Sequence, residues 1–238
     1  MPTRILPAAI LAGGLATRLR PVTEKIPKSL VEIAGEPFIA HQLRLLHSRG
    51  LRRVVLCIGY LGEMIEDYLG NGAAFGVEVS YSPDGAQLRG TAGAIAQARH
   101  LLGDRFFVVY GDSYLPCDYT AVQTAFEAGA KPALMTVYPN GDRWDSSNVE
   151  FAEGRILNYD KKNRTSAMRY IDYGLGVFEA SCFDAIPPQG THDLASLYQD
   201  LLRRDLLTGC EVTQRFYETG SFQGIEELSA YLKQGLPE

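Results

Sequence analysis

The chain begins with short apolar runs that alternate with longer amphipathic stretches. Between the apolar runs lie four stretches whose apolar positions are spaced as in helices, at residues 38–49, 62–69, 92–101 and 119–128. The apolar runs are bounded by glycine, proline or aspartate and are too short for helices, so we predict strands at residues 5–11, 54–58, 77–81, 106–110 and 133–137. This βαβ alternation predicts a mainly parallel sheet with helices on both faces.

The pattern changes after residue 138. Residues 148–151 and 156–159 flank Ala152-Glu153-Gly154-Arg155, which predicts a β-hairpin, and residues 173–178 are a further strand candidate. Helical spacing returns around Leu194 to Leu202, and a terminal helix is predicted over residues 221–233 with Ser221 as its N-cap. We therefore expect one α/β domain over residues 1–238, with a Rossmann-like, mainly parallel mixed sheet flanked by helices and a smaller mixed region in the second half.

Composition and charge narrow the class of protein. Of the residues, 46% are hydrophobic and 21% charged, and the formal net charge is −5, as in ordinary soluble globular proteins. The acidic balance argues against nucleic acid or an anionic membrane as partner. No apolar run approaches the ~20 residues of a membrane span. The cysteines are scattered without a C-x-x-C pair, so we expect a reducing, cytoplasmic location and no structural zinc.

The loop after the first predicted strand carries the strongest chemical signal. Open α/β sheets bind ligands beyond the carboxyl ends of their strands, which here directs attention to the loops after Leu11, Tyr81 and Tyr110. Gly13 and Gly14 would let backbone N–H groups approach an anion or a planar base. The loop has neither the P-loop nor the dinucleotide pattern. Four cations follow it in an otherwise acidic chain, and a solvated basic loop is the alternative explanation for Arg18, Arg20, Lys25 and Lys28.

At this point the residues resemble a known family. The run from Leu11 to Pro37, LAGGLATRLRPVTEKIPKSLVEIAGEP, is similar to the signature of the sugar-1-phosphate nucleotidyltransferases, also called nucleoside-diphosphate-sugar pyrophosphorylases. The pattern is most similar to short bacterial members that act on mannose-, heptose- or N-acetylmuramic acid 1-phosphate. The resemblance extends over almost the whole chain through Gly90-Thr91-Ala92-Gly93-Ala94, Tyr110-Gly111-Asp112, Asp160-Lys161, Tyr173-Gly174-Leu175-Gly176 and Tyr217-Glu218-Thr219-Gly220-Ser221.

The resemblance implies an activity. Family members transfer a nucleotidyl group from an NTP to a sugar 1-phosphate and release pyrophosphate, here in the synthesis of precursors for cell-surface glycans. The attacking phosphate is already a dianion at neutral pH, so catalysis consists of holding two polyanions together and stabilising the leaving group. Residues 1–138 would form the nucleotide-binding part, and residues 139–238 would form the sugar-binding part with the terminal helices. A homodimer is plausible from the resemblance alone.

The matched positions suggest roles. Arg18 and Lys28 would be catalytic cations on the phosphates, and Asp112 and Glu218 would hold Mg²⁺, with Glu218 standing where the family commonly has aspartate. The nucleotide would be bound by Leu11, Ala12, Gly13, Gly14, Gln87, Gly90 and Thr91. The sugar phosphate would be bound by Lys161, Asp172, Gly174 and Asn148, although Lys162 replaces the proline that usually follows the lysine.

Three questions stay open on the sequence. Gln87 complements uracil or thymine and, if its amide is flipped, guanine, so the base is not decided. A catalytically silent sugar-nucleotide sensor on the same fold is the alternative function, and retention of Arg18, Lys28, Asp112 and Glu218 disfavours it. A metal-dependent glycosyltransferase is a third hypothesis, but no D-x-D follows a strand.

Overall fold

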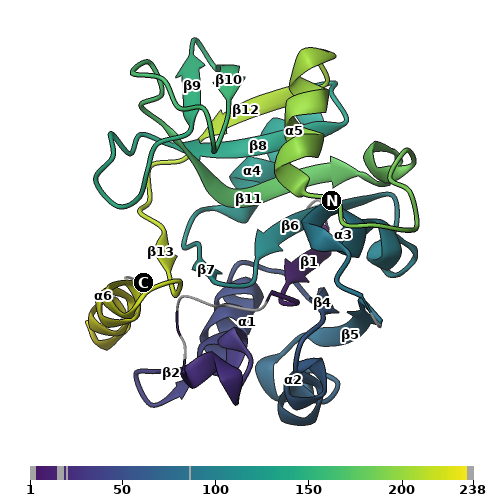
Figure 1. The fold of residues 1–238 in the computed structure, drawn as a ribbon, viewed down its shortest axis with the longest axis vertical. Coiled ribbons are helices and arrows are strands. Elements are labelled where there is room, and N and C mark those ends of the chain that lie inside the picture. The colour runs from purple at the N-terminus through teal and green to yellow at the C-terminus, as the bar shows by residue number, and fades with distance from the viewer. Residues whose placement is uncertain (1–3, 15–18, 20, 86, 235–238) are drawn as a thin grey trace.

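The centre of the protein is a seven-stranded sheet in the order β12-β8-β11-β6-β1-β4-β5 (Figure 1). The computed structural model describes residues 4–14, 19, 21–85 and 87–234. The strands are β1 Ala8–Leu11, β4 Arg53–Ile58, β5 Glu78–Pro83, β6 Arg105–Tyr110, β8 Ala133–Tyr138, β11 Ile171–Glu179 and β12 Leu207–Glu211. All five strands predicted for the first half are present, which confirms the α/β class.

The sheet is parallel except around β11. Strand β1 is parallel to β4 and β6, β4 to β5, and β8 to β12, whereas β11 is antiparallel to both β6 and β8. The register of β11 against β8 shifts between Asp172 and Gly176, and Gly174 within this bulge has φ 95°. The predicted mainly parallel mixed sheet is therefore confirmed, with its antiparallel strand in the middle.

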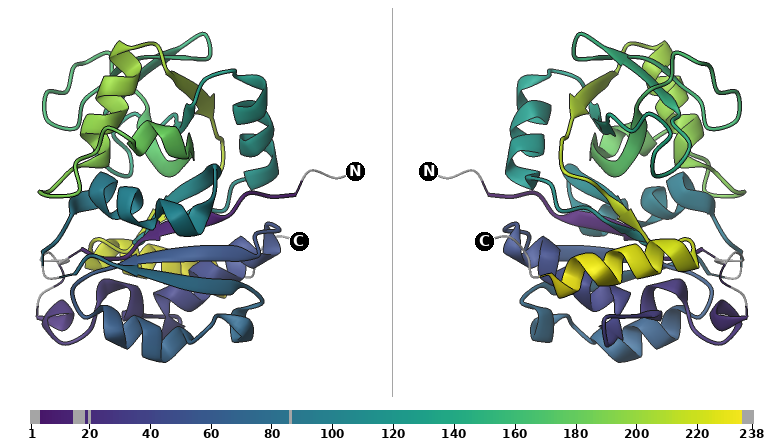
Figure 2. Two further views of the ribbon diagram at one scale, coloured as in Figure 1. Left: turned by 90° about the vertical axis from the view of Figure 1, so that its right-hand side faces the viewer. Right: turned by 90° about the vertical axis from the view of Figure 1, so that its left-hand side faces the viewer.

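Helices cover both faces of the sheet (Figure 2). They are α1 Phe38–Ser48, α2 Gly62–Leu69, α3 Gly90–Leu102, α4 Tyr119–Ala128, α5 Leu194–Arg203 and α6 Phe222–Lys233. Alternate residues of β1 point to opposite faces: Ile10 joins α1, α2 and α4 in one core cluster, and Ala9 joins α3 and α5 in the other. Short 3₁₀ helices are Val22–Glu24, Lys28–Leu30, Ala73–Phe75 and Ala180–Phe183.

Three small antiparallel pairs complete the fold. Strands β9 Val149–Ala152 and β10 Arg155–Tyr159 form the predicted hairpin, and β2 Glu32–Ile33 pairs with β3 Glu36–Pro37. Strand β7 Ser113–Tyr114 pairs with β13 Tyr217–Glu218. The last pair brings the segment before α6 to the carboxyl end of β6.

The C-terminal helix begins as predicted. The Ser221 hydroxyl accepts a hydrogen bond from the backbone N–H of Gly224 at 3.1 Å, which confirms Ser221 as the N-cap of α6. Leu228 of this helix packs with Phe38, Leu45 and Tyr114 in a third core cluster, next to α1 (Figure 2). Among the described residues, no helix combines the length and the apolar character of a membrane span.

Candidate active site

A cavity of about 410 Å³ lies where β1, β5 and β6 end, within the size range of small-molecule sites. The loops after Leu11, Tyr81 and Tyr110, where the sequence predicts a ligand site, all contribute to its lining. The predicted nucleotide-binding residues that line it are Leu11, Ala12, Gly13, Gly14, Gly90 and Thr91, and Lys28 and Asp112 line it as well. Gln87 is exposed and is not among the described lining residues. Arg18 lies outside the described residues.

Glycines allow the loops at this edge to pack backbone against backbone. A Cβ on Gly13 would lie 3.2 Å from the Gly59 nitrogen, and one on Gly59 would lie 2.8 Å from the Gly13 carbonyl oxygen. A Cβ on Gly111 would come well inside 3.0 Å of the Leu11 carbonyl oxygen, which accepts the Gly111 N–H at 3.0 Å. The loops after β1, β4 and β6 therefore fix one another and shape the cavity floor.

Lys28 and Asp112 form an ion pair beside the cavity. The Lys28 Nζ lies 2.6 Å from Asp112 Oδ2, and their side chains are 15% and 34% exposed. Lys28 opens a 3₁₀ helix directly after Pro27, whereas Asp112 follows β6 after one glycine. A predicted catalytic cation and a predicted metal ligand are thus in direct contact.

Glu218 reaches the same place through the β7–β13 pair. It is opposite Ser113 in register, and the next residue, Thr219, donates its backbone N–H to the Asp112 carbonyl at 2.8 Å. Burial raises the pKa of Glu218 to about 7, and the negative charges of Asp112 and Asp145 add to this effect. Burial and the nearby charge of Asp112 therefore both disfavour the charged form of Glu218.

This pair of carboxylates fits Mg²⁺. Mg²⁺ prefers hard oxygen ligands and is commonly bound by one or two carboxylates together with substrate phosphates. Within the described part of the chain, no group of three or more His, Cys, Asp or Glu side chains is placed to hold a metal ion. A metal at Asp112 and Glu218 would thus depend on the substrate for its remaining ligands.

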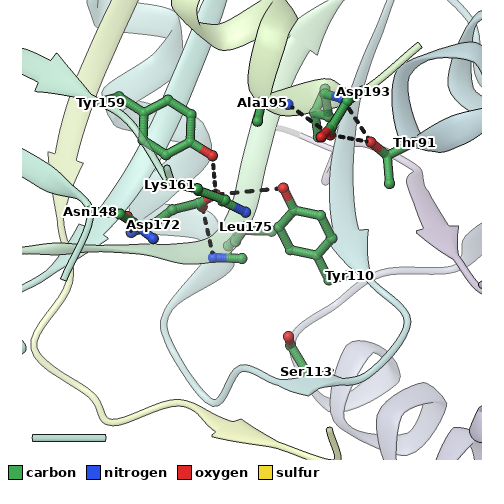
Figure 3. A network of polar contacts seen from close by, with 12 residues as sticks. Thr91, Tyr110, Ser113, Asn148, Tyr159, Lys161, Asp172, Leu175, Asp193 and Ala195 are labelled. Atoms are coloured by element: carbon green, nitrogen blue, oxygen red, sulfur yellow. Dashed lines mark hydrogen bonds and ion pairs between the residues drawn. The ribbon is translucent and has the colours of Figure 1, made fainter. Parts of the chain in front are cut away.

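The four predicted sugar-phosphate residues also come together, around Asp172 (Figure 3). Lys161 Nζ lies 3.5 Å from Asp172 Oδ2. The Gly174 N–H donates to Asp172 Oδ1 at 3.1 Å, and the Asp172 N–H donates to Asn148 Oδ1 at 2.9 Å. Motif positions far apart in the sequence therefore form one polar cluster.

Two tyrosines of this cluster were given no role in the site on the basis of the sequence. Tyr159 and Tyr110 donate their hydroxyls to Asp172 Oδ2 at 3.2 and 3.5 Å, and Figure 3 shows them approaching the carboxylate from two sides. Burial raises the pKa of both phenols far above the usual value, so both stay protonated and donate. Each ends a strand, where a tyrosine looks like any other core residue.

Thr91 has a role inside the protein besides lining the cavity. Its hydroxyl donates to Asp193 Oδ1 at 2.9 Å and accepts the Leu194 N–H at 2.7 Å, joining the start of α3 to the start of α5 (Figure 3). The His192 carbonyl accepts the N–H groups of Ala92 at 2.9 Å and Gly93 at 3.3 Å. The N-terminus of α3 is thus capped by a distant loop.

Asp84 is a second cavity residue that the sequence did not single out. It follows β5 directly, is buried, and accepts the Arg89 N–H at 3.2 Å on Oδ2. Burial raises the pKa of its carboxyl group. The sequence predicts a ligand site in the loop after Tyr81, which contains Asp84, but the resemblance to the family indicated Gln87 in that loop.

Known proteins agree with this picture. Residues 7–235 match the family model described as nucleotidyl transferase. The chain is 33% identical to N-acetylmuramate alpha-1-phosphate uridylyltransferase of Neisseria meningitidis, over 94% of this chain and 96% of that one. It is 34% identical to the mannose-1-phosphate guanylyltransferase catalytic subunit beta of Dictyostelium discoideum, over 77% of this chain but only 52% of that one.

A solved structure shows the same fold. The structure from Bacillus anthracis assigned as a glucose-1-phosphate thymidylyltransferase, in complex with a sucrose, superposes with a TM-score of 0.85 at 21% identity, covering 98% of this chain and 96% of that one. Family match, relatives and fold coincide with the motifs that surround the cavity. The chain therefore belongs to the nucleotidyl transferase family of enzymes.

Proposed function

We propose that this protein transfers a nucleotidyl group from an NTP to a sugar 1-phosphate in a Mg²⁺-dependent reaction. The observation that carries the proposal is the meeting of Lys28, Asp112 and Glu218 beside the glycine-lined cavity. A cation and a carboxylate in the cavity lining, with a second carboxylate on the adjoining β7–β13 pair, suit a substrate that carries several phosphates and a divalent metal.

The reaction needs no general base. An oxygen of the sugar 1-phosphate dianion attacks the α-phosphorus of the NTP, the bond from that phosphorus to the bridging oxygen breaks, and pyrophosphate leaves. Mg²⁺ at Asp112 and Glu218 would neutralise charge on the phosphates. Lys28 would contribute a second positive charge there, and Arg18 a third by its match to the family motif.

The two substrates would bind on different sides of Asp112. The backbone N–H groups around Gly13 and Gly14 suit the nucleotide, because no Cβ separates them from the cavity. Lys161 would bind the phosphate of the acceptor sugar. In this proposal residues 1–138 supply the nucleotide side, and residues 139–238 supply the sugar side together with Glu218.

The relatives suggest which substrates to test first. The Neisseria meningitidis relative, which matches over nearly its whole length, is named for UTP chemistry on N-acetylmuramate 1-phosphate, and the Dictyostelium relative for guanylyl transfer to mannose 1-phosphate. We extend the proposal to a cytoplasmic enzyme that makes precursors for cell-surface glycans.

Pyrophosphate release tests the proposed function. Purified protein with Mg²⁺ is incubated with each of UTP, GTP, CTP, dTTP and ATP against a panel of sugar 1-phosphates, and NDP-sugar is identified by mass spectrometry. We expect turnover with at least one pair. No turnover with any pair, together with tight binding of an NDP-sugar, would instead establish the silent sensor.

A further inference from the structure

The carboxylate of Asp172 is fully committed within the protein. Its side chain is 2% exposed. Oδ1 accepts the Gly174 N–H, and Oδ2 accepts the hydroxyls of Tyr159 and Tyr110 while lying 3.5 Å from Lys161 Nζ (Figure 3). Because the side chain is almost completely buried, a sugar hydroxyl could reach Asp172 only if one of the groups that cover it moved away.

The same tyrosines also face the Lys161 ammonium. Its Nζ lies 5.0 Å from the centre of the Tyr110 ring and 6.0 Å from that of Tyr159, within or at the range of cation–π attraction. The Lys161 side chain is nevertheless 43% exposed. The ammonium is therefore held on one side by a carboxylate and two rings, and is open to a ligand on the other.

The bulge in β11 makes this arrangement possible. Gly174 has φ 95°, a conformation that favours glycine, and a Cβ at this position would lie 3.2 Å from Tyr110 Cδ2. The bulge turns the Gly174 N–H back to Asp172 and leaves space for the Tyr110 ring. Backbone and rings together fix the carboxylate before any ligand arrives.

The position of Lys161 points toward the reacting groups. The Lys161 Nζ lies 5.0 Å from the centre of the Tyr110 ring, and Tyr110 lines the same cavity as Asp112. A long, flexible lysine side chain has many rotamers, so an ammonium that is already placed binds an anion at a smaller entropic cost.

We propose that Asp172 is a positioning residue that holds the Lys161 ammonium toward the acceptor phosphate and does not bind a sugar hydroxyl. The carboxylate acts through Lys161, and the hydroxyls of Tyr110 and Tyr159 fix the carboxylate. The identity of the anion as a sugar 1-phosphate rests on the proposed function, whereas the placement of Lys161 by Asp172 does not.

The placement is tested without substrate by NMR. Reductive methylation with ¹³C-formaldehyde labels each lysine and keeps its charge. In the wild-type protein we expect the Lys161 methyl signal to be shifted upfield by the two rings, and in Asp172→Asn to move toward the position of an unstructured lysine. The signal of the neighbouring Lys162 is the internal control and should not move. An unchanged Lys161 signal in folded Asp172→Asn would overturn the proposal.

A double-mutant cycle tests the functional consequence. With the active substrate pair, Asp172→Asn and Lys161→Met should each lower kcat/KM for the sugar phosphate about 10-fold or more, with the KM for the NTP nearly unchanged. The double variant should be no worse than Lys161→Met alone, because Asp172 acts through that lysine. If Asp172→Asn lowered kcat/KM by the same factor in the wild type and in the Lys161→Met variant, Asp172 would bind the sugar directly and the proposal would fail.

A second variant covers loss of folding in Asp172→Asn. Tyr159→Phe keeps the ring and removes one hydroxyl from the carboxylate, so it should move the Lys161 signal and lower kcat/KM in the same direction by a smaller factor. No movement of the signal in folded Tyr159→Phe, with Asp172→Asn unfolded, would overturn the proposal. If wild-type protein shows no turnover with any substrate pair, the proposed function fails, and the NMR result still decides the role of Asp172.

Discussion

At the scale of single residues, the site depends on charged side chains that contact one another and on glycines at positions where a Cβ would clash with the backbone. Lys28 and Asp112 are in contact at 2.6 Å, and burial together with the charge of Asp112 raises the pKa of Glu218. These groups came from motif matches, which identify the residues but give no distances. Tyr110 and Tyr159 were missed because apolar patterns assign strand-end residues to the core, whereas Asp84 lies in a loop that the sequence did indicate.

Asp112→Asn tests the central carboxylate. The substitution keeps size and hydrogen bonding but removes the charge that suits a divalent cation, so we expect kcat to fall by at least about 100-fold. Thermal unfolding should stay near that of the wild type, because Asp112 is partly exposed. An Asp112→Asn enzyme with ordinary turnover would contradict the assignment of Asp112 as a metal ligand.

Gly111→Ala tests the close approach of two loops. The new methyl group would meet the Leu11 carbonyl oxygen, which belongs to the backbone and has little freedom to move. We expect a loss of about 1–3 kcal/mol in the free energy of unfolding, measured with urea. Gly14→Ala is the matched control, because a Cβ there meets nothing within 4 Å. Equal stability of the two variants would contradict the packing argument.

At the scale of elements, the sequence predicted most of the sheet and left out its short parts. The first-half strands were predicted because each contains a continuous apolar run, and the helices because each is long enough to show helical spacing of its apolar residues. Strands β7 and β13 have two residues each, too few for any pattern, and the edge strand β12 carries Gly209 and partly exposed side chains. The contacts that place Glu218 and Thr91 are long-range, with Thr91 and Asp193 separated by 102 positions.

Thr91→Val tests the link between α3 and α5. Valine has a similar shape but cannot accept the Leu194 N–H or donate to Asp193, so we expect a loss of about 1–3 kcal/mol in the free energy of unfolding. Thr91→Ser keeps the hydroxyl and should remain close to the wild type. The KM for the NTP should rise in Thr91→Val, because α3 begins at the cavity wall. Both variants are compared by urea unfolding and steady-state kinetics.

At the scale of the whole molecule, a net charge of −5 describes the surface and not the site. Lys28 and Lys161 gather where the carboxylates Asp112 and Glu218 are also found. An acidic surface discourages large polyanions, whereas in the site each of these lysines is paired with a carboxylate, so an anionic substrate brings its own cation or displaces a carboxylate. The sequence indicated both features, but only the fold brings the cations of the first and second halves together.

Metal removal tests how far the fold depends on Mg²⁺. EDTA should stop pyrophosphate release, whereas the melting temperature without substrate should hardly change, since the core is formed by apolar clusters on both faces of the sheet. Differential scanning fluorimetry with and without EDTA measures this. A large fall in melting temperature on chelation would show a structural metal that the described residues give no reason to expect.

The β7–β13 pair has a consequence for how the enzyme is made. The glycine loop, Lys28 and Asp112 are all synthesised well before Glu218, which arrives with the segment just before α6. The cavity is completed at the same late stage, because Gly220, which lines it, follows Glu218 in the chain. If Glu218 holds the metal as proposed, the site is complete only after α6 has docked beside α1 and fixed the segment before it.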